Sequence, residues 1–292
     1  MFTATLLTNP ETPVLDRTMV ESLRNAWAGG NALWLAPGIA AEFPVQSVPA
    51  NRAEVWQDLQ AMGIDMAVQP TANRKKRLLI ADMDSTMIQQ ECIDELADEA
   101  GVGAHVAAIT ARAMNGELEF EGALRERVGL LKGLPESIIA KVIATRITLM
   151  PGGPVLLATM RSNGARTALV SGGFTAFTNA IAARLGFHEN RANTLLVENA
   201  TLTGHVADPI LGANAKVQAL REITTRLGLT PADAIAVGDG ANDLPMLQTA
   251  GTGVALHAKP NVQAQTNIRI NHGDLTALLY LQGYAQTEFT PC

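Results

Sequence analysis

Two aspartates separated by one residue, Asp82 and Asp84, follow directly after a short apolar run. The run, residues 78–81, reads Leu-Leu-Ile-Ala and predicts a strand that is buried on both faces of a parallel sheet. The carboxyl end of such a strand is where a doubly wound sheet binds its ligands. Carboxylates at this spacing on extended chain point to the same side, so their repulsion calls for a cation such as Mg²⁺ or for a protonated acid. In a simpler interpretation, Asp84 or Ser85 caps a helix that begins near Met87.

Two later segments carry other groups that phosphate chemistry needs. Residues 168–170 predict a second apolar strand, followed by a hydroxyl and two glycines whose bare backbone N–H groups can approach a phosphate. Residues 234–238 predict a third strand that ends in polar side chains, and Lys216 lies upstream at the start of a helical pattern. The polar residues are Ser171 and Gly172 after the second strand, and Asp239, Asn242 and Asp243 after the third. Together these strand ends indicate a phosphoryl-transfer site.

The ordered motifs resemble those of the haloacid dehalogenase superfamily of phosphohydrolases, and within it the branch that hydrolyses phosphoserine. The resemblance covers residues 75–281 and includes Glu91, Phe120 and Arg127 between the first and second strands. It implies an aspartyl-phosphate intermediate on Asp82, the last step of serine biosynthesis, and an α/β core with a small helical cap. A related branch passes the phosphoryl group to another alcohol such as homoserine, and other small phosphomonoesters are also candidate substrates.

The resemblance also implies a role for each site residue. Asp82 is the nucleophile, and Asp84 protonates the leaving hydroxyl and then deprotonates water. Mg²⁺ is held by the Asp82 side chain, the Asp84 backbone carbonyl and the Asp239 side chain, while Asp243 orients Lys216 and the metal-bound waters. The phosphoryl oxygens are held by Ser171, Gly172, Lys216 and Asn242.

Substrate selection rests on fewer residues. Phosphoserine carries an ammonium and a carboxylate, and Glu91 and Arg127 fit these two groups. The resemblance assigns Met114 and Phe120 to an apolar lid over the pocket. From the pattern alone, however, Glu91 and Arg127 could be ordinary solvated charges on helices.

The elements that position these residues follow from the alternation of apolar runs. Strands and helices alternate after residue 74, which predicts a doubly wound parallel sheet. Residues 88–149 predict helices only, so we expect a core of residues 74–87 and 150–292 with this segment inserted as the cap. Residues 195–203 predict a hairpin beside the sheet.

The first 73 residues predict the order βαββαβ, an α+β, ferredoxin-like domain. This segment resembles the ACT-type regulatory domains that some enzymes carry. A dimerisation or stabilising module without a ligand is the alternative, and a homodimer is therefore a candidate assembly. The basic residues 74–77 mark the boundary and fit a solvated linker.

Composition excludes several classes of protein. The chain of 292 residues has a net charge of −6 and is 47% hydrophobic, so we expect no affinity for nucleic acid or anionic membranes. The absence of a leader-like N-terminus and of a long apolar run indicates the cytoplasm. Cys92 and Cys292 give neither a disulfide framework nor a metal motif, and Cys92 fits a buried filler.

Two other classes of protein remain open. A signalling receiver module also uses a phosphoacceptor aspartate, a hydroxyl and a lysine, but the second acid, Asp84, and the helical insertion argue against it. An amino-acid sensor that works through residues 1–73 is the other alternative.

Overall fold

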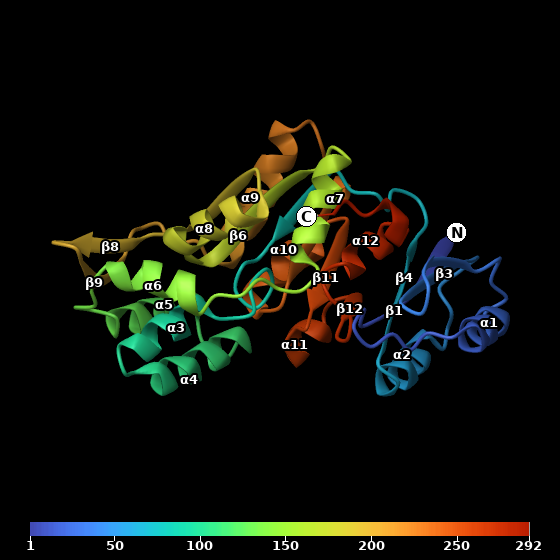
Figure 1. Cartoon of the computed structure of the whole chain (residues 1–292), viewed down its shortest axis with the longest axis horizontal. Coiled ribbons are helices and arrows are strands. Elements are labelled where there is room, and N and C mark those ends of the chain that lie inside the picture. Colours follow the sequence, from blue (N-terminus) through green and yellow to red (C-terminus); the bar gives the residue numbers. More distant parts are fainter. Residues whose placement is uncertain (292) are drawn as a thin grey trace.

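The computed structural model describes residues 1–291 and contains two main sheets. Figure 1 shows the larger sheet in the middle of the molecule, the helical insertion at lower left and the N-terminal elements at right. Within residues 1–291, no helix has the length and apolar character needed to cross a bilayer. The predicted fold class, a doubly wound α/β core with an additional α+β region, is confirmed.

The N-terminal unit, as we call the elements of residues 1–73, follows the predicted βαββαβ order. Its sheet has the order β2-β3-β1-β4, and all neighbouring strands are antiparallel. This is the ferredoxin-like arrangement, in which two helices follow strands one and three. The elements are β1 (Phe2–Thr8), α1 (Arg17–Ala26), β2 (Leu33–Ala36), β3 (Ala40–Val45), α2 (Arg52–Ala61) and β4 (Ile64–Pro70).

The central sheet has six parallel strands in the order β12-β11-β10-β5-β6-β7. From β5 the chain winds outward through β6 and β7, then returns to the other side of β5 as β10. The switch point therefore lies between β5 and β10. The strands are β5 (Leu78–Ala81), β6 (Arg166–Phe174), β7 (Glu189–Asn193), β10 (Ala234–Gly238), β11 (Thr252–Leu256) and β12 (Ile268–Ile270).

Helices cover both faces of this sheet, which explains the continuous apolar runs of its inner strands. In β5, Leu79 packs in one hydrophobic cluster and Ile80 packs in the other, on the opposite face. Helices α7, α8 and α12 belong to the first cluster, and α9 and α10 belong to the second. These helices are α7 (Gly153–Ser162), α8 (Thr175–Leu185), α9 (Ala213–Arg226), α10 (Leu244–Thr249) and α12 (Ala277–Leu281); the short α11 is Pro260–Gln263.

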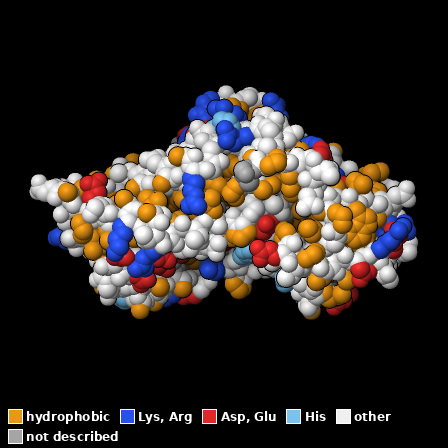
Figure 2. Space-filling model, viewed as in Figure 1, with side chains coloured by type: hydrophobic (Ala, Val, Ile, Leu, Met, Phe, Trp, Pro, Cys, Tyr) orange, Lys and Arg blue, Asp and Glu red, His pale blue; other side chains and the backbone are white. Residues whose placement is uncertain are grey.

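The insertion after β5 consists of the four helices α3 (Cys92–Glu99), α4 (Gly103–Met114), α5 (Phe120–Gly129) and α6 (Ser137–Thr145). We call this segment the cap. The helix predicted to begin near Met87 begins instead at Cys92, because residues 84–91 form a turn that carries Ser85 at a φ of 53°. Figure 2 shows acidic and basic side chains interspersed over the cap, which is the pattern of a solvated helical surface.

The predicted hairpin, β8 (Leu195–Glu198) and β9 (Thr201–Val206), does not lie beside the central sheet. It forms a separate two-stranded sheet that reaches out to the cap (Figure 1). Three backbone hydrogen bonds tie it to the loop between α5 and α6, for example from Gly133 N to Leu202 O at 2.9 Å. The hairpin thus belongs to the support of the cap.

The N-terminal unit is packed against the central sheet rather than tethered by a free linker. Leu7, Leu35 and Ala67 share one hydrophobic cluster with Tyr280 of α12. The buried Asp65 carboxylate accepts hydrogen bonds from the backbone N–H groups of residues 271–273, at 2.8–2.9 Å. The two parts are therefore joined by apolar packing and by a carboxylate that satisfies three backbone donors.

Candidate active site

The polar residues after β5, β6 and β10 meet at one edge of the central sheet, because these three strands are parallel neighbours. Asp82 directly follows β5, Ser171 lies within β6, and Asp239 directly follows β10. All three side chains are buried. The spacing predicted from the sequence therefore produces a real cluster at the switch point.

Lys216 lies at the centre of this cluster. Its ammonium lies 2.7 Å from Asp82 Oδ1 and donates to Asp243 Oδ1 at 2.6 Å. Burial alone would lower the pKa of Lys216, but Asp243 and Asp82 together raise it above its ordinary value. Lys216 is therefore a fixed, fully buried cation beside the proposed nucleophile.

Three buried carboxylates lie close together beside this ammonium. One oxygen from each of Asp82, Asp239 and Asp243 lies within 4.8 Å of the others. Burial, with the neighbouring Asp243, raises the pKa of Asp82 well above its usual range and that of Asp239 to about 7. Among the described residues, Asp239 Oδ2 has no hydrogen-bond partner, whereas its Oδ1 accepts from Thr86 at 3.2 Å. An acidic cluster with an unsatisfied buried oxygen has the donor chemistry to bind a hard divalent cation.

Asp84 is not part of that carboxylate cluster, and its two oxygens have other partners. Its Oδ1 accepts the backbone N–H of Cys92, the first residue of α3, at 3.0 Å, and its Oδ2 lies 3.4 Å from Ser171 Oγ. Burial raises the pKa of Asp84, and the hydrogen bond from Cys92 offsets part of this rise. The capping interpretation and the catalytic one are thus compatible, since one oxygen binds the helix and the other faces the site. The buried Cys92 packs in the core as predicted.

The loop Ser171-Gly172-Gly173 is approached closely by side chains of the cap and of the core. The backbone N–H of Gly173 donates to Ser171 Oγ at 2.8 Å. A Cβ on Gly172 would lie 2.7 Å from Phe120 Cζ, and one on Gly173 would lie 2.6 Å from Asp84 Oδ2. Only glycine leaves room at both positions for the cap and the acid.

One small cavity joins the core residues to the cap. Its volume is about 40 Å³, and its walls include all the core and cap residues that the sequence singled out except Lys216, Asp239 and Asp243. This cavity is smaller than an amino-acid ligand, so the cap is closed. The predicted residues that line it are Asp82, Asp84, Glu91, Met114, Phe120, Arg127, Ser171, Gly172 and Asn242.

Arg127 and Glu91 are held by different partners. Arg127 is only 5% exposed, which contradicts the solvated-charge interpretation, and it donates to the Ala123 carbonyl and to Thr110 Oγ1, each at 3.0 Å. Glu91 accepts from Ser85 Oγ at 2.6 Å, and burial beside Asp84 raises its pKa well above the ordinary value. The cavity thus has a buried cation on one wall and an acid on another.

Several supporting residues were missed from the sequence. Thr110, which binds Arg127, donates in turn to Asp94 Oδ1 at 2.6 Å, so two cap residues fix the guanidinium. Asn193 donates to Gly172 O at 2.8 Å and accepts from Leu211 N at 2.6 Å, which joins the loop of residues 171–173 to the segment before α9. Neither arrangement has a recognisable sequence pattern, because single Thr, Asp and Asn residues on helices and edge strands are common.

The family model for haloacid dehalogenase-like hydrolases matches residues 79–248. The chain belongs to this family. It is 41% identical over 246 residues to a phosphoserine phosphatase of Archaeoglobus fulgidus, covering 82% of this chain and 71% of that protein. It is 48% identical over 204 residues to one of Haemophilus influenzae, covering 70% of this chain but only 65% of that protein.

Solved structures agree with this placement. A HAD family hydrolase of Salmonella enterica serovar Typhi has a TM-score of 0.83 at 31% identity and covers 96% of this chain, with 98% of its own length matched. A substrate-bound phosphoserine phosphatase has a TM-score of 0.68 at 42% identity over 70% of this chain and 98% of its own. The likeness to the Salmonella hydrolase thus includes most of the N-terminal unit.

Proposed function

We propose that this chain is a phosphoserine phosphatase, which hydrolyses O-phosphoserine to serine and phosphate. The observation that carries the proposal is the single closed cavity. It brings the carboxyl pair Asp82 and Asp84 and the hydroxyl of Ser171 together with a buried guanidinium and an acid on the cap. A phosphate monoester needs the first set of groups, and the ammonium and carboxylate of an amino acid need the second.

In the first step, an Asp82 oxygen attacks phosphorus in line with the serine oxygen, and the bond from phosphorus to that oxygen breaks. Asp84 gives its proton to the departing serine hydroxyl, a role that suits a buried acid with a raised pKa. In the second step, Asp84 takes a proton from water as the water attacks the aspartyl-phosphate. Phosphate leaves and Asp82 is regenerated.

The remaining residues stabilise charge and orient the substrate. Lys216, Ser171, the Gly172 N–H and Asn242 hold the phosphoryl oxygens, and Asp243 keeps Lys216 in place. Mg²⁺ bound by Asp82, Asp239 and the Asp84 carbonyl would neutralise negative charge on those oxygens. Arg127 pairs with the substrate carboxylate and Glu91 with its ammonium, while Met114 and Phe120 exclude water.

For the N-terminal unit we propose a stabilising role, supported by its shared hydrophobic cluster and by the Asp65 contacts. A second role as an ACT-like regulatory or dimerisation module, with a homodimer as the assembly, stays a prediction. The acidic net charge and the small-molecule substrate fit a cytoplasmic enzyme.

The test is phosphate release from a panel of phosphomonoesters, with Mg²⁺ and then with chelator. We expect phosphoserine to be preferred over phosphothreonine, phosphoglycolate and an aryl phosphate, and activity to disappear with chelator. Product analysis with added homoserine separates hydrolysis from transfer. Equal rates on all four esters would contradict the proposed substrate, and formation of phosphohomoserine would favour the transferase.

A further inference from the structure

A second, larger cavity lies between the N-terminal unit and the core, far from the catalytic cluster. Its volume is about 380 Å³. Thr252 begins β11 and Ile268 begins β12, so the cavity opens at the amino ends of these strands, whereas Asp82 and Asp239 lie at carboxyl ends. It is therefore a separate site and no part of the substrate pocket.

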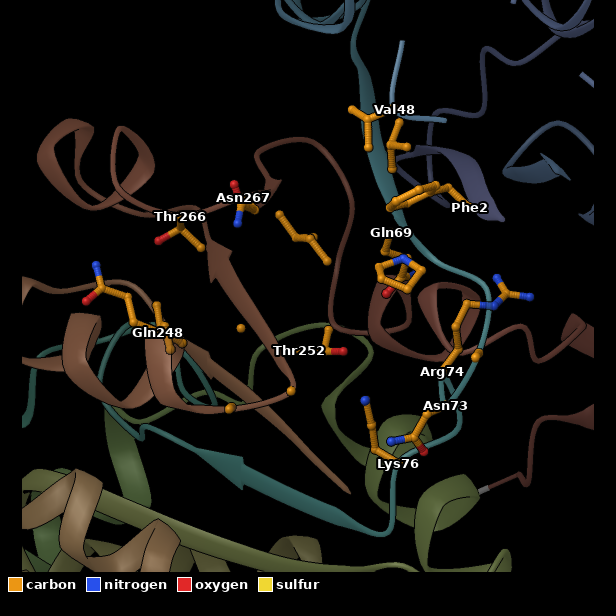
Figure 3. A pocket seen from close by; sticks show the side chains of 18 of the residues that line it. Phe2, Val48, Gln69, Asn73, Arg74, Lys76, Gln248, Thr252, Thr266 and Asn267 are labelled. Carbon is orange, nitrogen blue, oxygen red and sulfur yellow. The ribbon is translucent and has the colours of Figure 1, made fainter. Parts of the chain in front are cut away.

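The two walls of this cavity come from different parts of the chain. Figure 3 shows Phe2 and Gln69 of the N-terminal unit on one side and Thr266 and Asn267 of the core on the other. The Lys76 side chain lies below Gln69 and Thr252, next to Asn73, on the segment that connects the two parts. A molecule bound here would touch both walls at once.

The charged side chains that line this cavity are all positive. They are Arg52, Arg74 and Lys76, and the described lining contains no aspartate or glutamate, although the whole chain has a net charge of −6. Arg74 is already neutralised by Glu42, which accepts from its two terminal nitrogens at 2.6 and 3.0 Å. Two cations are therefore left to face the cavity.

These two cations lack anionic partners. Lys76 is only 8% exposed, and its ammonium donates to the Ala232 carbonyl at 2.8 Å without forming an ion pair within residues 1–291. Burial lowers the pKa of Lys76, and the more distant Asp233 offsets part of that effect. The partly buried side chain of Arg52 forms neither an ion pair nor a hydrogen bond with the described residues. Cations placed this way are poorly compensated, and an anion would restore the balance.

We propose that this interdomain cavity binds a small organic anion, a carboxylate or phosphate compound of metabolite size, through Lys76 and Arg52. The hydroxyl group of Thr252 and the amide group of Asn267 supply hydrogen bonds to the rest of the ligand. Because the ligand contacts both walls, it stabilises the packing of the N-terminal unit on the core.

The experiment follows the thermal unfolding midpoint of the full chain on addition of inorganic phosphate or of succinate. The variants are Lys76→Met and Arg52→Gln, with Lys75→Met as the matched control, since Lys75 is exposed and lies outside the cavity. At saturating anion we expect a rise of about 3 °C in the wild type and in Lys75→Met, for at least one of the two anions. With that anion the rise should be reduced in the other two variants, by more than half if the anion is succinate. The anion whose rise the variants reduce tells a phosphate site from a carboxylate site.

Phosphate that binds at the catalytic site raises the midpoint equally in all four proteins, so only the part lost in the variants reports on this cavity. Should Lys76→Met fail to fold, Arg52→Gln decides the matter, because Arg52 is only partly buried and lies at the start of α2. We expect both variants to hydrolyse phosphoserine at the wild-type rate without added anion. Equal rises in the wild type and Arg52→Gln, or no rise with either anion, would overturn the proposal.

Discussion

At the scale of single residues, the charge of the catalytic cluster is unbalanced. Asp82, Asp239 and Asp243 are buried around one ammonium, that of Lys216. Burial is the main reason why the pKa of Asp239 rises to about 7, and the excess of negative charge from Asp243 adds to this rise, whereas Lys259 and Lys216 oppose it. The same excess favours a divalent cation at neutral pH.

Asp82→Asn should abolish hydrolysis, by at least about 10³-fold, because the amide keeps the volume but cannot attack phosphorus. The fold should persist, since Lys216 retains Asp243 as a partner. Phosphate release and the unfolding midpoint are measured together, with Asp58→Asn on the exposed face of α2 as control. Near-normal turnover in Asp82→Asn would exclude the covalent route.

Arg127→Ala should weaken phosphoserine hydrolysis by about 2–5 kcal/mol, because a desolvated charge pair with the substrate carboxylate is lost. An aryl phosphate, which has no carboxylate, should lose much less. Arg125→Ala is the matched control on the same helix, since Arg125 is exposed and pairs with Asp208. If Arg127→Ala slows the hydrolysis of both substrates equally, Arg127 supports the closed cap and does not bind the substrate carboxylate.

The variant Asp239→Asn tests the effect of the buried Asp239 charge on the free energy of unfolding without metal. A folded-state pKa of about 7, against 3.8 when unfolded, means that the folded metal-free protein binds the extra proton and loses stability as pH rises from about 4 to 7. The neutral amide escapes this loss. Without metal, the variant should exceed the wild type by up to about 4 kcal/mol at pH 8 and by little at pH 4.

Urea unfolding at the two pH values measures this difference, and added Mg²⁺ should reverse it at pH 8 by stabilising the wild type alone. A difference that is the same at both pH values would show that Asp239 is ionised throughout in the folded protein.

At the scale of elements, the cap packs closely against the loop of residues 171–173, where Gly172 lies next to Phe120. Gly172→Ala would place a methyl group 2.7 Å from Phe120 Cζ. We expect at least about a tenfold loss of kcat/KM, since the cap must shift to accept the methyl group. Gly129→Ala at the end of α5 is the control, because its Cβ would meet no atom within 4 Å. Equal activity in the two variants would mean that the cap does not close on this loop during turnover.

The sequence predicted elements well where burial is one-sided or complete. The runs of β5 and β10 are entirely buried, and their apolar character identified them. Strand β7 was not predicted, because it is a polar edge strand whose residues are mostly only partly buried. The hairpin was predicted, but its position was wrong, because a strand pattern does not say which surface the hairpin will pack against.

The candidate site shows the same division. Residues at strand ends could be predicted because parallel strands bring their carboxyl ends together. The Thr110–Asp94 support of Arg127 depends on how α3, α4 and α5 pack, which no local pattern encodes. The Lys76 and Arg52 cavity likewise exists only because β4 packs beside β12.

At the scale of the whole molecule, we expect the N-terminal unit to contribute to the stability of the enzyme. Asp65→Asn should lower the free energy of unfolding by about 1–3 kcal/mol, because an amide oxygen cannot satisfy three backbone donors as a carboxylate does. Chemical unfolding measures the change, with Asp58→Asn as control. Turnover at low temperature should be unchanged, since Asp65 does not line the substrate cavity. An unaltered unfolding free energy would mean that the two parts are held by apolar packing alone.

The strand order also governs when the enzyme can become active during its synthesis. The N-terminal sheet pairs only segments within residues 2–70, so it can form as soon as they emerge from the ribosome. The central strand β5, however, pairs with β10, where Leu78 lies beside Ala234. The proposed nucleophile, Asp82, therefore lacks Lys216 and Asp239 until most of the chain has been made. A nascent chain that already contains Asp82 is therefore inactive. We expect activity only after β10 pairs with β5 and brings Asp239 to the site.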